Sequence, residues 1–109
     1  MTVNDLQAAL SLTPVSLPEG DREVEGVYIG DLLSWVMGRA QSGNVWLTIM
    51  SNLNIVAVAT LSDVSCIVLC EGVTLDETVK NTAEAKGINI LATDMTAYEA
   101  AKKLAELGL

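Results

Sequence analysis

Eight residues in four short polar segments have the types that bind ligands or begin helices. They are Gly30, Asp31, Ser51, Asn52, Glu71, Gly72, Thr74 and Thr93. Each segment follows an apolar run that is typical of a strand. The carboxyl ends of parallel strands meet at one edge of a sheet, where ligands bind and where helix N-termini can accept an anion. The sequence therefore predicts a small-molecule pocket at this edge.

The same residue types also serve as ordinary helix caps. A Ser, Thr, Asp or Asn side chain at a helix start accepts a hydrogen bond from a first-turn N–H group. Asp31, Asn52, Thr74 and Thr96 each precede a segment with helical periodicity. Acidic side chains in these loops would also repel a phosphate. Both interpretations, cap and ligand contact, stay open at these positions.

The sequence offers little for catalysis. It contains no His, which excludes Ser–His and Cys–His pairs and any His-ligated metal. Neither the phosphate-binding pattern G-x-x-x-x-G-K-[ST] nor the dinucleotide pattern G-x-G-x-x-G is present. We predict no catalytic residue, no metal site and no cofactor. An enzyme built from this chain would depend on carboxylates and lysines.

The two cysteines are four positions apart on one apolar run. In an extended strand Cys66 and Cys70 would lie about 13 Å apart, too far for a disulfide. Two thiols alone do not make a zinc site. We expect Cys66 in the core and Cys70 at a strand end, where exposure would make a reactive role a minor alternative.

Composition and charge narrow the class of protein. The chain has 109 residues, half of them hydrophobic, which fits one domain with a substantial core. Its net charge is −8 and it has no Lys/Arg cluster, so we expect no nucleic-acid partner. No apolar run reaches the roughly 18 residues that cross a bilayer. The first ten residues lack the basic residue of a secretory signal. We therefore expect no membrane partner and a cytoplasmic protein.

Apolar periodicity predicts alternating strands and helices after an N-terminal helix. The first helix is expected over residues 2–10, followed by an extended segment over 12–17. Strands are then predicted at 23–29, 45–49, 65–69 and 88–91, and helices at 31–40, 52–61, 74–86 and 96–107. Such alternation is typical of a parallel sheet. The predicted fold is a single α/β domain over residues 1–109, with a mainly parallel sheet and helices on both faces.

The helix predicted from Asn52 to Leu61 is the most unusual element. It is apolar on nearly every side, so other elements or a second copy of the chain must cover it. This predicts a homodimer through that helix. Trp35, at the edge of the apolar stripe of the preceding helix, is either a core residue or an interface anchor.

Two sets of segments resemble known domains. Residues 2–6 and 21–32 resemble the N-terminal domain of the HPr kinase/phosphorylase, and residues 53–59, 70–72 and 87–91 are similar to the DRTGG domain. The resemblance implies an α/β regulatory or assembly domain that dimerises, placed in some relatives beside adenine-nucleotide sites. The phosphate-binding loop of the kinase belongs to a separate domain that this chain lacks. Where relatives commonly carry Thr-Gly-Gly, this chain has Cys70, Glu71 and Gly72.

The sequence favours a non-catalytic regulatory and dimerisation module of a cytosolic assembly, such as a larger enzyme complex. The alternative is a sensor that binds a small molecule, such as an adenine nucleotide, at the carboxyl ends of the strands. A phosphotransferase is disfavoured, because the sequence has no phosphate-binding loop.

Overall fold

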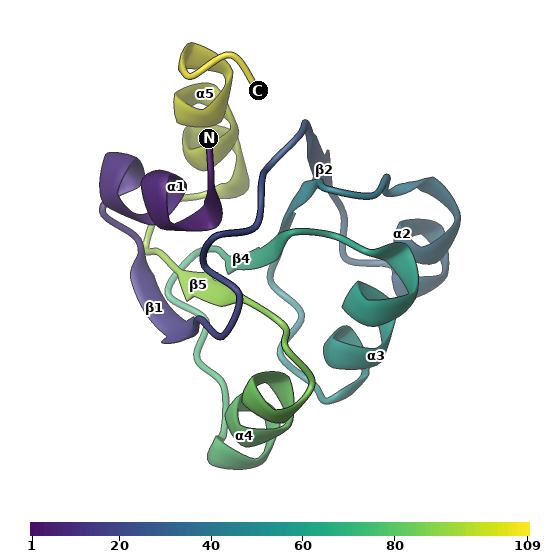
Figure 1. Cartoon of the computed structure of the whole chain (residues 1–109). Coiled ribbons are helices and arrows are strands. Elements are labelled where there is room, and N and C mark those ends of the chain that lie inside the picture. The colour runs from purple at the N-terminus through teal and green to yellow at the C-terminus, as the bar shows by residue number, and fades with distance from the viewer.

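Four strand–helix pairs follow one another in the computed structural model, which describes residues 1–109 (Figure 1). They come after an N-terminal helix and one further strand. The strands are β1 (Thr13–Ser16), β2 (Val27–Ile29), β3 (Val45–Thr48), β4 (Cys66–Leu69) and β5 (Ile90–Ala92). The helices are α1 (Val3–Leu10), α2 (Leu33–Arg39), α3 (Asn54–Ser62), α4 (Glu77–Ala85) and α5 (Ala97–Glu106).

All five strands form one sheet in the order β1-β5-β4-β3-β2. The strands from β2 to β5 are parallel to one another, and β1 runs antiparallel to β5 at one edge. This confirms the predicted α/β fold with a mainly parallel sheet. No helix combines the length and the apolar character that crossing a lipid bilayer requires.

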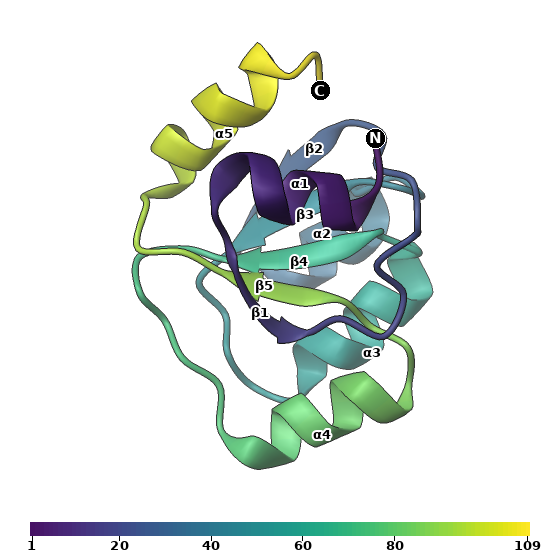
Figure 2. The same cartoon turned by 60° about the vertical axis from the view of Figure 1, so that its left-hand side comes forward.

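Helices cover both faces of the sheet (Figure 2). The first face packs against α2, α3 and α4, and the second against α1 and α5. Successive side chains of a strand point alternately into the two hydrophobic cores, one on each face of the sheet. Trp46, Ile67 and Ile90 point into the first core, and Leu47, Val68 and Leu91 into the second. Every residue of β3 and β4 is buried, which explains why these strands are continuous apolar runs.

Two helix starts are capped as predicted, two are not, and the fifth predicted cap, Asn52, lies one position before the N-cap of α3, Leu53. Thr2 and Thr96 each form a capping box with the acidic residue three positions later. The predicted cap Thr74 is wrong, because Asp76 is the N-cap of α4 and accepts from the N–H of Val79 at 3.2 Å. The predicted cap Asp31 is also wrong, because α2 begins after Leu32 without a side-chain cap.

The strand predicted over residues 23–29 is shorter in the structure. Only its last three residues, in β2, pair with β3. Glu23 instead forms an isolated antiparallel bridge with Thr2, and the N–H of Glu25 donates to the carbonyl of Gly43. Gly26 then turns the chain into β2 with a φ of +73°, a conformation that favours glycine.

Most of α3 is covered within its own chain. Ile55, Val56, Val58 and Ala59 are buried against the sheet and the flanking helices α2 and α4. The apolar surface that the sequence indicates is therefore largely used by the fold. The outward side of α3 and the residue that precedes it still expose Leu53, Ala57 and Leu61.

Candidate functional site

The carboxyl edge of the sheet holds one shallow depression of about 170 Å³. It lies where β1 begins and where β4 and β5 end. Its lining residues are Thr13, Gly72, Val73, Thr74, Ala92, Thr93 and Asp94. Gly72, Thr74 and Thr93 are three of the eight predicted site residues, and the structure brings them together here.

The backbone N–H groups in the loops around this depression already donate hydrogen bonds to carbonyl oxygens of the protein. The N–H of Glu71 donates to the carbonyl of Met95 at 2.8 Å, and that of Gly72 to the carbonyl of Thr93 at 3.0 Å. A side chain added at Gly72 would lie 3.1 Å from a carboxylate oxygen of Asp94. The two N–H groups are therefore already bonded, and a negative charge stands beside them. This arrangement suits a ligand that donates hydrogen bonds better than it suits a phosphate.

Gly30 and Asp31 lie at the other end of the same edge, between β2 and α2, and accept hydrogen bonds from β3 and the residue that follows it. One carboxylate oxygen of Asp31 accepts from the hydroxyl of Thr48 at 2.9 Å and from the N–H of Ile49 at 3.0 Å. The carbonyl of Gly30 accepts from the indole N–H of Trp46 at 2.9 Å. These hydrogen bonds give both residues a structural role, and neither residue lines the depression.

Ser51 and Asn52 form a third group, in the loop between β3 and α3. Both are exposed, and the side-chain oxygen of Asn52 accepts from the N–H of Asn54 at 2.9 Å. This bond organises the start of α3 from one position before its N-cap, Leu53. The eight predicted residues are thus spread along the edge, and a ligand role for the set stays a prediction.

Both cysteines are buried and free. The minor alternative of an exposed, reactive Cys70 is wrong, because its side chain belongs to the core under α1 and α5. Burial raises the pKa of the Cys66 thiol to about 12. Burial, together with the carboxylates of Glu71 and Asp31, raises the pKa of Cys70 to about 11. The structure therefore gives neither thiol the environment of a nucleophile.

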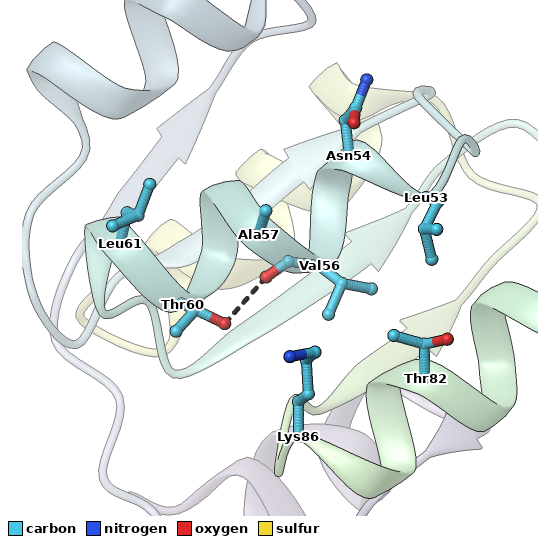
Figure 3. A pocket seen from close by; sticks show the side chains of 8 residues that line it. All are labelled: Leu53, Asn54, Val56, Ala57, Thr60, Leu61, Thr82 and Lys86. Atoms are coloured by element: carbon cyan, nitrogen blue, oxygen red, sulfur yellow. Dashed lines mark hydrogen bonds between the residues drawn. The ribbon is translucent and has the colours of Figure 1, made fainter.

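A larger groove of about 480 Å³ lies between α3 and α4 (Figure 3). Its lining residues are Leu53, Asn54, Val56, Ala57, Thr60, Leu61, Thr82 and Lys86. Val56 is buried at the groove, whereas Leu61 is 73% exposed and Leu53 is 47% exposed. Thr82 and Lys86 contribute the wall on α4. The sequence analysis missed these two residues, although the burial of Val79 and Ala83 on the neighbouring stripe places them beside α3.

The sequence matches the DRTGG domain over residues 17–107. The chain belongs to the DRTGG domain family. A search of curated proteins finds no match for it.

One solved structure shares the fold of this DRTGG domain. It contains the CBS and DRTGG domains of the regulatory region of Clostridium perfringens pyrophosphatase, complexed with the activator diadenosine tetraphosphate. The TM-score is 0.73 and the sequence identity is 14%. The match covers 94% of this chain and 45% of that chain, so this DRTGG domain spans less than half of the pyrophosphatase fragment. At this identity the likeness shows the fold alone.

The motif position of this DRTGG domain has an unusual backbone. Glu71 and Gly72 both have positive φ, +61° and +72°. A non-glycine residue in this left-handed region costs about 1–2 kcal/mol, which explains why glycines suit both positions. Glu71 therefore adds backbone strain and a carboxylate where the resembling domains commonly carry glycine.

Proposed function

We propose that this DRTGG domain is a non-catalytic regulatory domain that acts as a homodimer, with the outer surface of α3 as the contact. The observation that carries the proposal is the row formed by Leu53, Ala57 and Leu61. These three residues are spaced by four and share one side of the helix. All three are exposed, although the rest of the apolar surface of α3 is buried.

The row is symmetric about its central alanine. When two such helices pack antiparallel about a two-fold axis, Ala57 lies on the axis and lets the backbones approach closely. Leu53 of one copy then meets Leu61 of the other, and the reverse contact repeats on the far side. A self-complementary patch of this kind is what a two-fold dimer requires.

Charge supports the same surface. Each copy carries a net charge of −8, so two copies repel one another unless they meet through an uncharged face. Residues 40–62 contain no Asp, Glu, Lys or Arg, and all of α3 lies within this segment. By contrast α1, α4 and α5 all carry acidic residues.

The groove between α3 and α4 supplies room beside the row. Its volume of about 480 Å³ exceeds that of a single leucine side chain, and Val56 lies buried at it. We expect apolar side chains of the second copy to fill it. Asn54, Thr82 and Lys86 provide polar groups around them, as at the rim of a protein interface.

The oligomeric state tests this proposal directly. We expect the chain to sediment as a dimer at micromolar concentration, and Ala57→Arg to sediment as a folded monomer because it places a charge on the two-fold axis. The matched control is Ala105→Arg, an exposed alanine of α5 away from the row. A strict monomer for the unmodified chain would overturn the dimer, as would an Ala57→Arg protein that still forms it.

The regulatory part of the proposal rests on the family and on chemistry. The solved relative comes from the regulatory region of a larger enzyme. The resemblance to the N-terminal domain of HPr kinase/phosphorylase implies a similar role apart from catalysis. This chain has no His and holds its two thiols buried with raised pKa. We infer a cytosolic module that acts on, or within, a larger enzyme complex.

A second candidate function is the sensing of a nucleotide at the carboxyl edge. It is favoured by the diadenosine tetraphosphate in the solved relative and by the depression at Gly72, Thr74 and Thr93. The carboxylate of Asp94 would accept hydrogen bonds from ribose hydroxyls or from an amino group of a base. We therefore expect the nucleoside part, rather than the phosphates, to lie there.

Thermal unfolding with ATP, AMP, adenosine and diadenosine tetraphosphate tests this second candidate. A ligand at about a hundred times its dissociation constant adds roughly 2.7 kcal/mol of stability. Binding should weaken in Asp94→Asn, whereas Asp21→Asn, an exposed acid outside the depression, should leave it unchanged. No shift with any of the four compounds would exclude this site in the isolated domain.

A further inference from the structure

The outer side of α3 is too small to hold a stable dimer by itself. Helix α3 has nine residues, so at about 1.5 Å per residue and a width of about 10 Å its outer side covers only about 140 Å². A stable interface between two proteins buries about 800 Å² on each partner. The dimer proposed above therefore needs a second contact, on a helix beside α3.

Helices α2 and α4 flank α3 in the layer that covers the first face of the sheet (Figure 1). Helix α4 carries the exposed carboxylates of Glu77 and Glu84. Helix α2 carries no acidic residue, and Arg39 is the only charged residue between Asp31 and Asp63. Two copies that each carry a net charge of −8 can therefore meet over α2 and α3 without close contacts between carboxylates.

Helix α2 leaves large apolar side chains exposed. Val36 is its only buried residue, and Ala40 packs beside it against the first core. Leu32, Trp35 and Met37 are all at least half exposed. Several large apolar side chains gathered on one exposed helix are typical of an interaction surface.

The indole ring of Trp35 is already ordered against its own helix. The guanidinium of Arg39 stacks on the ring, with 3.5 Å between the guanidinium carbon and the ring centroid. The Trp35 side chain is still 52% exposed, so a partner can cover much of it. An ordered aromatic side chain loses little conformational entropy on binding, which suits it to anchor an interface.

Gly38 leaves a hollow beside Trp35. The two residues are three positions apart and are therefore neighbours on the helix surface. A Cβ atom added at Gly38 would meet no atom within 4 Å, and Gly38 does not have a positive φ. Glycine inside a helix is destabilising relative to alanine, and nothing in the packing of this chain requires it here. Close approach of a second helix would give Gly38 a role.

We propose that α2 forms the second part of the dimer contact, by packing antiparallel against α2 of a second copy so that Trp35 of each copy fills the hollow at Gly38 of the other. This inference rests on the dimer proposed above and names its anchor residue. A two-fold axis halfway along α2 that places residue 35 opposite residue 38 also places residue 34 opposite residue 39. Arg39 of each copy then lies opposite Ser34 of the other, whose hydroxyl can accept a hydrogen bond from the guanidinium.

A single two-fold axis can cross both helices. Both α2 and α3 follow strands of the parallel sheet, so they run in the same direction. An axis perpendicular to α3 at Ala57 turns α2 and α3 antiparallel to their copies, and it sets α2 opposite α2. The axis positions on the two helices, between Val36 and Met37 and at Ala57, each lie within one residue of the middle of the helix.

The fluorescence of the unmodified chain tests this contact without any substitution. Trp46 is fully buried, so acrylamide quenching of the native protein reports on Trp35. We expect quenching to be weaker at high micromolar than at nanomolar concentration. On dilution it should rise over the same range in which sedimentation shows the dimer dissociating.

Gly38→Gln should change stability and association in opposite directions. Glutamine has a much higher helix propensity than glycine and its Cβ meets no neighbouring atom, so the variant should unfold at a higher urea concentration when both proteins are monomeric. The same side chain occupies the hollow, so the dissociation constant of the dimer should rise at least about tenfold. The matched control is Ala105→Gln, at an exposed position of α5, which should leave that constant unchanged.

The outcomes distinguish the α2 contact from the α3 row. A dimer in which Trp35 is quenched equally at all concentrations would overturn the α2 contact and leave the α3 row in place. The same conclusion would follow from a Gly38→Gln protein that dimerises like Ala105→Gln. A dimer that Gly38→Gln weakens and Ala57→Arg leaves intact would support the α2 contact and overturn the α3 row. A strict monomer for the unmodified chain would overturn both.

Discussion

Replacing Leu61 with glutamine should weaken the proposed dimer without weakening the fold. Leu61 is the most exposed leucine of the chain, at 73%, and it ends the row on α3. Glutamine has nearly the helix propensity of leucine, so the monomer should lose less than about 0.5 kcal/mol of its unfolding free energy. Any larger effect on association therefore comes from the contact itself.

The expected loss follows from the exposed fraction. Full burial of a leucine side chain stabilises by roughly 1.5–3 kcal/mol, so burying the exposed part of Leu61 contributes about 1–2 kcal/mol. A two-fold dimer buries this side chain twice, which gives about 2–4 kcal/mol. The dissociation constant should thus rise about 30-fold to 1000-fold in Leu61→Gln.

Sedimentation equilibrium over a range from nanomolar to high micromolar concentration measures this change. The control is Leu107→Gln, a half-exposed leucine that follows α5 on the opposite face of the sheet. Urea unfolding of each variant at equal concentration separates stability from association. If Leu61→Gln and Leu107→Gln dissociate at the same concentration, α3 is not the contact, and the symmetry argument fails.

Three further predictions concern the fold and its thiols. Glu71→Gly should raise the free energy of unfolding by about 1 kcal/mol in urea titrations, because it relieves a positive φ, whereas Glu71→Gln should change it much less. At pH 8 the thiols of the native protein should react with Ellman's reagent at least about 100-fold more slowly than the thiols of the protein unfolded in urea. The reason is that burial raises the pKa of Cys70 to about 11 and that of Cys66 further. Rapid labelling of the native protein would contradict the burial of the thiols. The Ser42 hydroxyl and the Arg22 guanidinium lower the pKa of Asp63, so this group's contribution to stability is present above pH 3.8 and is lost as pH falls through the folded pKa. In urea titrations of Asp63→Asn, the free energy of unfolding should depend less on pH below that value. Asn is a suitable replacement because it also tolerates the positive φ at this position.

The fold was predictable because its signals are local. Each buried strand is a short apolar run, and each capping box is formed by residues within a stretch of four, as at the helix starts Thr2 and Thr96. Alternation of strands and helices then leaves few topologies for a chain of this length. The strand over residues 23–29 was overestimated because apolar alternation does not reveal Gly26, with its positive φ, as the point where pairing begins.

The site was less predictable because each of its residue types can cap a helix, bind a ligand or hold two strands together. Thr74 and Asp76 are both good caps two positions apart, and only the path of the loop decides that Asp76 begins α4. The burial of Cys70 depends on helices from both ends of the chain, which no nearby residue specifies. Asp31 has the pattern of a cap or ligand, but its carboxylate joins β2 to β3 through Thr48 and Ile49.

The distribution of charge connects these findings. At the carboxyl edge, Asp94 stands beside Gly72, and the nearby N–H groups are already bonded, which opposes phosphate binding. The outer surface of α3 is uncharged, so two copies that each carry a net charge of −8 could meet there without close contacts between carboxylates, which supports the dimer proposed above.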